Sequence, residues 1–314
     1  MASQTSRETK IWTVLELITW STAYLQEKKI DEARLTAELL LAHALSMKRI
    51  QLYMNFDKPL KPDELAAYKA LFKRRLEREP VQYIVGSTEF MGLPFAVDPR
   101  VLIPRPETEI LVEETIRLCK ELRSGAPVSL LDIGTGSGCI AVSCAKLIPS
   151  SRIAAVDASA SALDAARANA DRNGAEIAFM HADIFSDEIY QLECGGVSAV
   201  HEPQGGREER SGFDAIVSNP PYISCAVYET LQPEITKYEP RSAETDGADG
   251  LSFYRRIAVI GKALLARDGF IAVEHAWDQQ EAVASIFRSE GWRTIGTVND
   301  YSGHPRCVIA RDFA

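Results

Sequence analysis

The chain has 314 residues, of which 46% are hydrophobic and 25% charged, so it can bury a sizeable core without disulfides or a structural metal. Its 19 Gly and 15 Pro show no period, which excludes a collagen-like or low-complexity chain. The net charge of −9 divides unevenly, as +3 over residues 1–85 (14 Lys/Arg, 11 Asp/Glu) and −12 over residues 86–314 (21 and 33). An acidic surface repels a phosphate backbone, so we expect no nucleic-acid partner.

The sequence contains no apolar stretch of about 18 residues that could cross a membrane. The first ten residues, MASQTSRETK, lack the apolar core of a signal peptide. None of the six Cys lies in a Cys-x-x-Cys pair and the five His are scattered, so we expect neither a disulfide framework nor a metal site. These features predict a reduced, cytoplasmic protein without a membrane partner.

Residues 1–85 are predicted to form a small helical domain. One helix is expected near the N-terminus, a second after the N-cap residue Asp31, and a third from Pro62, because Pro is favoured in a first helical turn. The side chains expected on the apolar faces of the first two helices are Ile11, Val14, Leu15, Ile18, Leu25, Leu35, Leu39 and Ala42.

Residues 86–109 have short apolar stretches of period two and four Pro, which predicts a β-hairpin or extended linker between domains. From residue 110 to 314, predicted strands alternate with predicted helices, which is typical of a mostly parallel α/β sheet covered on both faces. Residues 194–212 are polar, Gly-rich and unpatterned, and predict a surface loop. Strands are expected at 128–134, 152–156, 177–180, 213–218, 269–273, 293–298 and 306–310, and helices at 139–147, 159–173, 252–265 and 278–289.

A Gly-rich turn, Asp132-Ile-Gly-Thr-Gly-Ser-Gly138, follows a predicted buried strand and opens a helix. Glycines at such a turn let a ligand approach the main chain. The turn is not a P-loop, because no Gly-Lys-Ser/Thr follows, and it fits the dinucleotide fingerprint only loosely. Asp157 ends the next strand and could bind both hydroxyls of a ribose, and Asp183 follows the third strand, where it could meet an adenine amino group.

Asn219-Pro-Pro-Tyr222 stands at the end of the predicted strand 213–218. The prolines offer carbonyls without a competing N–H, Asn219 adds a side-chain carbonyl, and Tyr222 adds a flat ring. Two acceptors and a ring can hold a planar NH2 group and aim its nitrogen at an activated methyl group. The tetrapeptide therefore predicts methyl transfer to an amide or amino nitrogen.

These motifs resemble those of Rossmann-like class I methyltransferases that use S-adenosylmethionine, and above all those of the HemK/PrmC family, which methylate the glutamine N5 of peptide-chain release factors. The resemblance runs nearly end to end, and IPRPETE (103–109) is its most discriminating segment, because DNA amino-methyltransferases with an NPPY lack it there. The sequence departs from the usual pattern at Ile184, where some relatives have Trp, and at 243–247 and 274–276. The matching segments are 34–45, 80–95, 101–109, 132–141, 217–223, 239–257, 274–283 and 300–306.

The resemblance implies a seven-stranded methyltransferase domain at 110–314, a hairpin linker at 86–109 and a substrate-recognition domain at 1–85. It implies an enzyme that acts on the Gly-Gly-Gln glutamine of class 1 release factors, with S-adenosylmethionine as cofactor and S-adenosylhomocysteine as product. We expect a monomer without a metal. The implied cofactor-binding residues are Asp132, Gly134, Thr135, Gly136, Ser137, Gly138, Asp157, Asp183, Ile184 and Asn219. The implied catalytic residues are Asn219, Pro220, Pro221 and Tyr222, and these four with Arg105, Pro106 and Glu107 are the implied substrate-binding residues.

Three other functions remain open on the residues alone. The target could be a glutamine of a ribosomal protein, with the same chemistry. It could be the exocyclic amine of adenine in nucleic acid, which is also a planar NH2 but requires base flipping and a basic cleft. The third possibility is a helical scaffold without catalysis or an oxidoreductase with a dinucleotide pocket.

Overall fold

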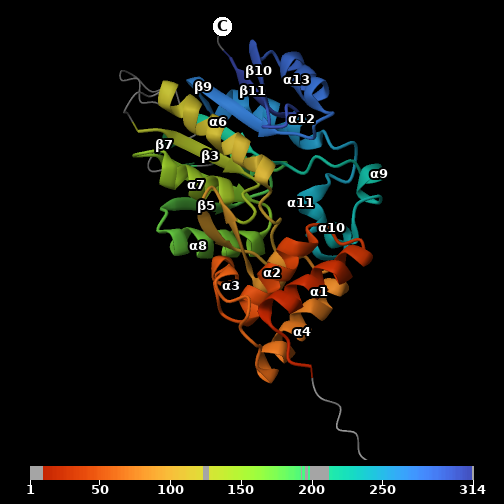
Figure 1. The fold of residues 1–314 in the computed structure, drawn as a ribbon. Helices are drawn as coiled ribbons and strands as arrows, with labels where there is room; N and C mark the ends of the chain where they lie inside the picture. The colour runs from red at the N-terminus through yellow and green to blue at the C-terminus, as the bar shows by residue number, and fades with distance from the viewer. Residues whose placement is uncertain (1–9, 123–126, 192, 195–196, 199–211, 313–314) are drawn as a thin grey trace, which may run out of the picture. The chain divides into compact units, whose positions relative to one another are not determined.

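The computed structural model describes residues 10–122, 127–191, 193–194, 197–198 and 212–312. The chain separates into two compact units, Met1–Gly86 and Ser87–Ala314 (Figure 1). Each unit has its own apolar core and is described by itself.

The first unit is made of helices packed around one buried apolar cluster. Thr13 and Glu16 form a reciprocal capping box that begins the first helix. Pro62 begins a helix, as predicted, although this helix is the fourth and not the third. In the core, the Tyr68 hydroxyl donates a hydrogen bond to Ser21 Oγ at 2.7 Å, so both buried hydroxyls are paired. The helices are α1 (Val14–Glu27), α2 (Ala33–Ala44), α3 (Arg49–Tyr53), α4 (Pro62–Leu76) and α5 (Val81–Val85).

Two predictions for this unit are wrong. Ile11 lies before α1 and is 72% exposed, and Leu15 faces outward on α1. Asp31 is not the N-cap of α2, because Glu32 takes that position in a left-handed conformation with φ 49° and without a side-chain capping bond. Nearly every face of α2 carries an apolar residue, so spacing alone does not select the buried one. The buried aliphatic residues of α2 are Ala33, Ala37, Leu40, Leu41 and Ala42, whereas Leu35 and Leu39 are half-buried.

In the second unit, the described residues form a seven-stranded sheet in the order β10-β11-β9-β8-β3-β4-β5. Five strands run parallel, and β10 and β11 add antiparallel pairs at one edge. The expected mostly parallel sheet of a Rossmann-like methyltransferase is thereby confirmed. The strands are β3 (Ser129–Ile133), β4 (Arg152–Asp157), β5 (Ile177–His181), β8 (Phe213–Ser218), β9 (Leu265–Glu274), β10 (Thr294–Asn299) and β11 (Pro305–Arg311).

Helices cover both faces of this sheet (Figure 1). Successive residues of one strand point to opposite faces, so Leu130 packs in the cluster that contains α6 and α7, and Leu131 in the cluster that contains α12 and α13. Burial on both faces explains why the central strands β3 and β8 are mostly apolar and are buried along their whole length. The long helices of this unit are α6 (Pro106–Leu122), α7 (Cys139–Leu147), α8 (Ala160–Asn173), α12 (Ser252–Leu264) and α13 (Gln280–Ser289).

The chain order reverses at β3, which pairs with β4 on one side and with β8 on the other. Ile133, the last residue of β3, is in register with both Val156 and Ser218. The Ser218 hydroxyl donates to the Ile133 carbonyl at 2.7 Å and ties the two strand ends together. In open α/β sheets, ligands bind at such a switch point, beside the carboxyl ends of the strands.

Residues 86–109 contain the expected hairpin, formed by β1 (Ser87–Phe90) and β2 (Leu93–Ala96). The hairpin packs on α8, where Asn169 exchanges two hydrogen bonds with the backbone of Ala96. The extended segment is shorter than predicted, because Pro106 already begins α6. That helix was not predicted, since Pro106 was counted with the other Pro of 86–109 as a sign of a hairpin or extended linker, although Pro suits a first turn.

Several short elements were also not predicted. They are the 3-10 helix η1 (Asp187–Gln191), the pair β6 (Glu193–Cys194) and β7 (Val197–Ser198), and the helices α9 (Cys225–Tyr228), α10 (Pro233–Tyr238) and α11 (Arg241–Glu244). Most of the loop expected at 194–212, namely 195–196 and 199–211, lies outside the described residues. No helix in the described ranges is long and apolar enough to span a membrane, and no group of three or more His, Cys, Asp or Glu there could hold a metal ion.

Candidate active site

The Gly-rich turn connects β3 to α7, and its three glycines all have positive φ, of 73° at Gly134, 55° at Gly136 and 80° at Gly138. A side chain at Gly134 would meet nothing within 4 Å, and one at Gly136 only the turn's own backbone. A side chain at Gly138 would press on Ala166 of α8, 3.2 Å from its Cβ. The first two glycines therefore border open space, and the third allows close packing of the turn on α8.

Asp132, at the start of this motif, is fully buried. Its Oδ2 accepts hydrogen bonds from the Thr135 hydroxyl at 2.7 Å and from the Ala141 N–H at 3.2 Å. Its Oδ1 has no hydrogen-bond partner among the described residues. Burial raises the pKa of Asp132 to about 7. The side chains of Thr135 and Ser137 are buried too, so these residues shape the turn from within.

Asp157 ends β4 next to the turn and is half-buried. Its Oδ2 accepts the Gly136 N–H at 2.9 Å, and its Oδ1 accepts the Ser159 N–H at 2.8 Å. Burial raises its pKa, although both backbone bonds oppose the shift. Asp157 therefore orders the Gly-rich turn and also presents a carboxylate at the sheet edge.

Asp183 and Ile184 follow β5 and differ in exposure. Asp183 is exposed, and its Oδ1 accepts the N–H of Phe185 at 2.9 Å. Ile184 is 5% exposed and packs in the sheet's apolar core, which leaves little of it for a ligand. The exposed aromatic ring is that of Phe185, which contacts Phe253 edge-to-face at 5.1 Å between centroids.

The tetrapeptide Asn219–Tyr222 leaves β8 beside the Gly-rich turn. Asn219 Nδ2 donates a hydrogen bond to Thr108 Oγ1 at 3.0 Å, so the amide carbonyl is the end left for other partners. Tyr222 is held at both ends: its backbone carbonyl accepts Gln279 Nε2 at 2.9 Å, and its hydroxyl donates to Glu274 Oε1 at 3.4 Å. The tetrapeptide therefore has a fixed conformation.

The loop between α11 and α12 packs closely against the backbone of Tyr222. Gly250 has φ 80°, and any side chain there would collide with the Tyr222 carbonyl oxygen. The carboxylate of Asp246 fixes this loop, because it accepts the N–H groups of Ala248, Gly250 and Ser252 at 2.8–3.0 Å. Only glycine allows this close approach between the loop and the tetrapeptide.

The segment before α6 holds the residues expected to bind substrate. Arg105 Nη2 donates to Glu239 at 2.6 Å and to Glu244 at 3.1 Å, and both carboxylates are buried. Arg105 is therefore engaged in an internal ion-pair network that fixes the segment. Pro106 is exposed and Glu107 half-buried in the first turn of α6.

The sequence analysis gave no individual role to Thr108 or Glu274, although both lie in segments that carry the resemblance, 103–109 and 274–283. Glu274 ends β9, is 1% exposed, and its Oε2 lacks a hydrogen-bond partner within the described ranges. Burial raises its pKa to about 7. The position of Glu274 at the end of a strand could have indicated a site residue. Strand β9 pairs with β8, Val273 is in register with Ser218, and Glu274 therefore lies at the same sheet edge as the tetrapeptide. Thr108 lies within the segment 103–109 that carries the resemblance, but its contact with Asn219 could not be foreseen because the helix that begins at Pro106 was not predicted.

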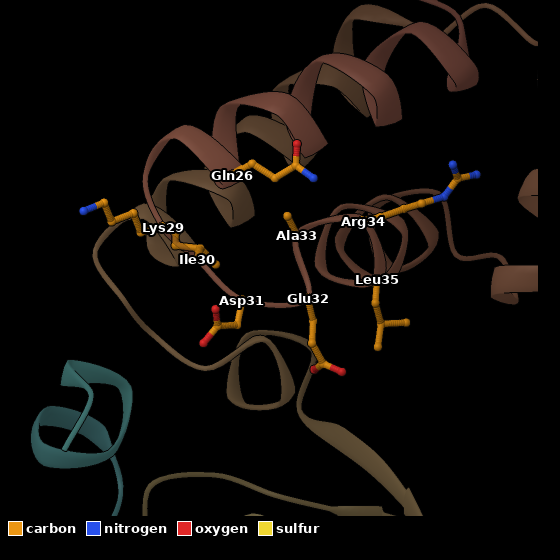
Figure 2. Close-up of a pocket in the computed structure, with 8 residues that line it drawn as sticks. All are labelled: Gln26, Lys29, Ile30, Asp31, Glu32, Ala33, Arg34 and Leu35. Atoms are coloured by element: carbon orange, nitrogen blue, oxygen red, sulfur yellow. The ribbon is translucent and has the colours of Figure 1, made fainter.

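A pocket of about 590 Å³ lies in the first unit (Figure 2). It surrounds the turn between α1 and α2, and its lining residues are Gln26, Lys29, Ile30, Asp31, Glu32, Ala33, Arg34 and Leu35. None of the predicted site residues lines it.

Comparisons with known proteins cover both units. The family model "PrmC N-terminal domain" matches residues 16–86, and "Methyltransferase small domain" matches residues 113–194. A release factor glutamine methyltransferase of Geobacter sulfurreducens is 43% identical over 302 residues, which are 96% of this chain and 98% of the relative. One of Chlorobaculum tepidum is 43% identical over 299 residues, 94% and 96% of the two chains.

Among solved structures, the human methyltransferase 10 domain containing protein is similar with a TM-score of 0.50 and 16% identity. The match covers 71% of this chain and 90% of that one. At this identity it supports the methyltransferase fold alone.

Proposed function

The chain belongs to the release factor glutamine methyltransferases, and we propose that the carboxyl edge of β3, β4, β8 and β9 is its active site. The enzyme transfers a methyl group to the side-chain amide nitrogen of a release factor glutamine. The observation that carries the site assignment is the fixed amide of Asn219, whose nitrogen is bound to Thr108 and whose carbonyl is left for a substrate N–H.

The residues at this edge fit S-adenosylmethionine. The space above Gly134 and Gly136 is open, the buried Oδ1 of Asp132 lacks a partner among the described atoms, and the first turn of α7 faces the same edge. A helix N-terminus favours an anionic group such as the methionine carboxylate. Asp157 would bind the ribose hydroxyls, and Asp183 would contact the adenine.

When bound, S-adenosylmethionine would supply an electrophilic methyl group on a sulfonium sulfur, and its S–CH3 bond would break to leave S-adenosylhomocysteine. An amide nitrogen is a poor nucleophile, because its lone pair is delocalised into the carbonyl. We propose that the carbonyl oxygens of Asn219 and Pro220 accept the two N–H bonds of the glutamine amide, which raises the electron density on nitrogen and aims its lone pair. The ring of Tyr222 packs against the amide plane.

Catalysis of this kind consists mainly of positioning. No strong base is needed before transfer, because the amide nitrogen becomes acidic once it is methylated and then loses its proton to water. Glu107 and the ordered segment around Arg105 would line the approach to the tetrapeptide, with the Arg105 network keeping that segment in place.

For the substrate, we propose the glutamine of the Gly-Gly-Gln tip of class 1 release factors. The helical unit, residues 1–86, would help to hold the folded factor, and the enzyme would act as a monomer in the cytoplasm, where release factors work. Support comes from the release factor glutamine methyltransferases described above. They match this chain over nearly its whole length and therefore include both units.

The test is incubation with S-adenosylmethionine and either an unmodified release factor or large-subunit ribosomal proteins, followed by peptide mass spectrometry. We expect one added methyl group on the Gly-Gly-Gln glutamine. Methylation of a ribosomal protein alone would overturn the proposed substrate, and methylation of neither would overturn the function.

Asn219→Ala should lower kcat at least about a hundredfold while cofactor affinity changes little, because a preorganised acceptor is lost. The matched control is Asn173→Ala, which removes an asparagine that binds the Pro94 carbonyl at the C-terminal end of α8. A near-normal rate for Asn219→Ala would contradict the two-acceptor mechanism.

A further inference from the structure

We propose that Arg256 of α12 is a positioning residue that fixes the turn Asp183–Ser186, so that the Asp183 carboxylate is held where it can accept the adenine amino group. The inference rests on the proposed function, in which Asp183 contacts the adenine, and it names the residue that keeps Asp183 in place. Arg256 binds backbone carbonyls of the turn and does not need to touch the cofactor.

The turn after β5 is closed by hydrogen bonds to Asp183. Its Oδ1 accepts the N–H of Phe185, and its backbone carbonyl accepts both the N–H and the hydroxyl of Ser186, each at 2.9 Å. Each carboxylate oxygen can accept two hydrogen bonds, so the exposed carboxylate of Asp183 can still bind a donor of a ligand. These bonds set the shape of the turn, but they join only residues within it.

Pairing in the sheet ends just before this turn. The last pair between β4 and β5 is Asp157 with His181, and the Ala182 N–H then donates to the Asp157 carbonyl at 3.2 Å. After Ala182 the backbone leaves the sheet. The position of the turn therefore depends on its contacts with other elements.

Arg256 of α12 makes such a contact with the backbone of the turn. Its Nε donates to the Ile184 carbonyl at 2.8 Å, and its Nη2 donates to the Ser186 carbonyl at 3.1 Å. The two donors belong to one rigid planar group, so they hold two carbonyls in a fixed relation to each other. Ile184 is also anchored by its side chain, which packs in the apolar core of the sheet.

The guanidinium of Arg256 acts mainly on these two carbonyls. Its other charged neighbour, Asp187, lies 4.0 Å away with a carboxylate that is 99% exposed, and an ion pair so open to solvent contributes little. The Arg256 side chain is only 19% exposed, so its charge-assisted bonds to the carbonyls are partly shielded from water. Loss of this side chain should therefore loosen the turn.

A second contact between α12 and the turn supports the same conclusion. The exposed ring of Phe185 packs edge-to-face on Phe253, with 5.1 Å between the ring centroids. Phe253 and Arg256 are three residues apart and so lie on the same face of α12. This face of α12 therefore contacts the turn at three successive residues, Ile184, Phe185 and Ser186.

A carboxylate with a fixed position can distinguish adenine from hypoxanthine. Adenine carries a donor at its 6-amino group, and a carboxylate accepts it. Hypoxanthine has an oxygen acceptor at that position and its nearest donor at ring atom N1, so the carboxylate would have to shift to bind it. A turn held by Arg256 should prevent this shift, and a loosened turn should allow it.

The first test is calorimetry with S-adenosylhomocysteine, the reaction product, and with S-inosylhomocysteine, in which hypoxanthine replaces adenine. The wild type should bind the adenine compound at least about tenfold more tightly, and in Arg256→Met this preference should fall to within about threefold. Arg256→Lys should give an intermediate preference, because its donors lie on one nitrogen. The matched control is Arg288→Met on α13, which removes an exposed pair with Glu281 and should keep the wild-type preference.

The second test is hydrogen–deuterium exchange of the enzyme without cofactor. In Arg256→Met the amides of Phe185 and Ser186 should exchange faster than in the wild type, while those of β4 stay protected. A double-mutant cycle adds Asp183→Ala to the calorimetry. This substitution should abolish the preference for adenine by itself, and Arg256→Met should then have no further effect on it.

An Arg256→Met variant with the wild-type preference for adenine would overturn this inference and leave the proposed function intact. Faster exchange throughout the sheet in that variant would show a general loss of stability and would also overturn a positioning role. A wild type that binds both compounds equally would refute the contact between Asp183 and adenine, and this inference with it. A wild type that binds neither compound would instead be a failure of the proposed function.

Discussion

Asp132, Asp157 and Glu274 each lie at the carboxyl end of a parallel strand, and their hydrogen bonds give them different tasks. Asp132 fixes the Gly-rich turn from the protein interior, because its carboxyl group accepts hydrogen bonds from Thr135 and Ala141. Asp157 accepts the Gly136 N–H of the turn and lies at the carboxyl edge of the sheet. Glu274 contacts the tetrapeptide through side chains only. Carboxylates thus fix both the Gly-rich turn, where we propose that the cofactor binds, and the tetrapeptide, where we propose that the substrate binds.

Replacing Asp157 should weaken binding of S-adenosylmethionine. Asp157→Ala removes a charge-assisted acceptor for the ribose hydroxyls, so affinity should fall about ten- to a hundredfold. Calorimetry checks this, with Asp164→Ala, an exposed position on α8, as the control. Unchanged affinity for Asp157→Ala would contradict the assignment to ribose.

The raised pKa of Glu274 also predicts how stability depends on pH. Between pH 4.5 and about 7 the folded protein keeps this proton while the unfolded chain has lost it. Unfolding then releases a proton, so the free energy of unfolding falls as the pH rises through this window, by at most about 1.4 kcal/mol per pH unit, and levels off above it.

Glu274→Gln should therefore gain stability relative to the wild type at pH 8 but not at pH 4.5, because glutamine does not titrate. Urea unfolding at both pH values checks this, and Glu290→Gln on the exposed end of α13 is the control. Parallel stability curves for Glu274→Gln and the wild type would refute the prediction.

At the scale of elements, the site depends on segments that do not belong to the predicted motifs. The loop between α11 and α12 presses Gly250 against Tyr222, and α13 is preceded by Gln279, which binds the Tyr222 carbonyl. Helix α6 supplies Thr108 to Asn219. Three separate elements therefore hold the tetrapeptide Asn219–Tyr222 in place. Catalysis that consists mainly of positioning requires such a preorganised site.

Gly250→Ala should impair methyl transfer more than stability. The added methyl group would displace the Tyr222 carbonyl, so kcat should fall by about tenfold or more, the expected result of misplacing a reacting group. Gly247→Ala in the same loop has a similar φ of 73° with open space around it, so it introduces the backbone strain alone. Steady-state rates and melting temperatures of the two variants separate the effects. Equal rates would show that the contact with Tyr222 is unimportant.

At the scale of the whole molecule, the residues proposed for methyl transfer all lie in Ser87–Ala314, and none lies in the helical unit Met1–Gly86. The second unit has its own two apolar clusters on the faces of the sheet. We therefore expect cofactor binding and recognition of the folded factor to be separable.

Removal of residues 1–86 should leave the affinity for S-adenosylmethionine unchanged and weaken the affinity for the folded release factor. A short peptide that contains Gly-Gly-Gln should be methylated equally by the full-length and truncated enzymes, because it reaches only the site of the second unit. Calorimetry and KM values for peptide and whole factor check this. Equal turnover of the whole factor by both enzymes would refute a recognition role for residues 1–86.

The sequence alone determined most elements of the second unit, because their signals are local. Ser159 caps α8 through the Ala162 N–H, and Gly174 ends the helix in a left-handed conformation, as predicted. The signals of the mostly apolar strands and of the Gly-rich turn likewise depend only on neighbours within a few residues. These signals fixed the order of the motifs along one sheet edge, and hence the predicted chemistry.

Only the tertiary structure decided which side chains complete the site. Thr108 and Asn219 are 111 positions apart in the chain, and Gly250 and Tyr222 meet across a loop. It also decided that Ile184 is buried, that Arg105 is held by two carboxylates, and which face of α2 is internal. The physical reason is that propensity, capping and periodicity act between near neighbours, whereas burial and hydrogen-bond direction depend on distant segments brought together by packing.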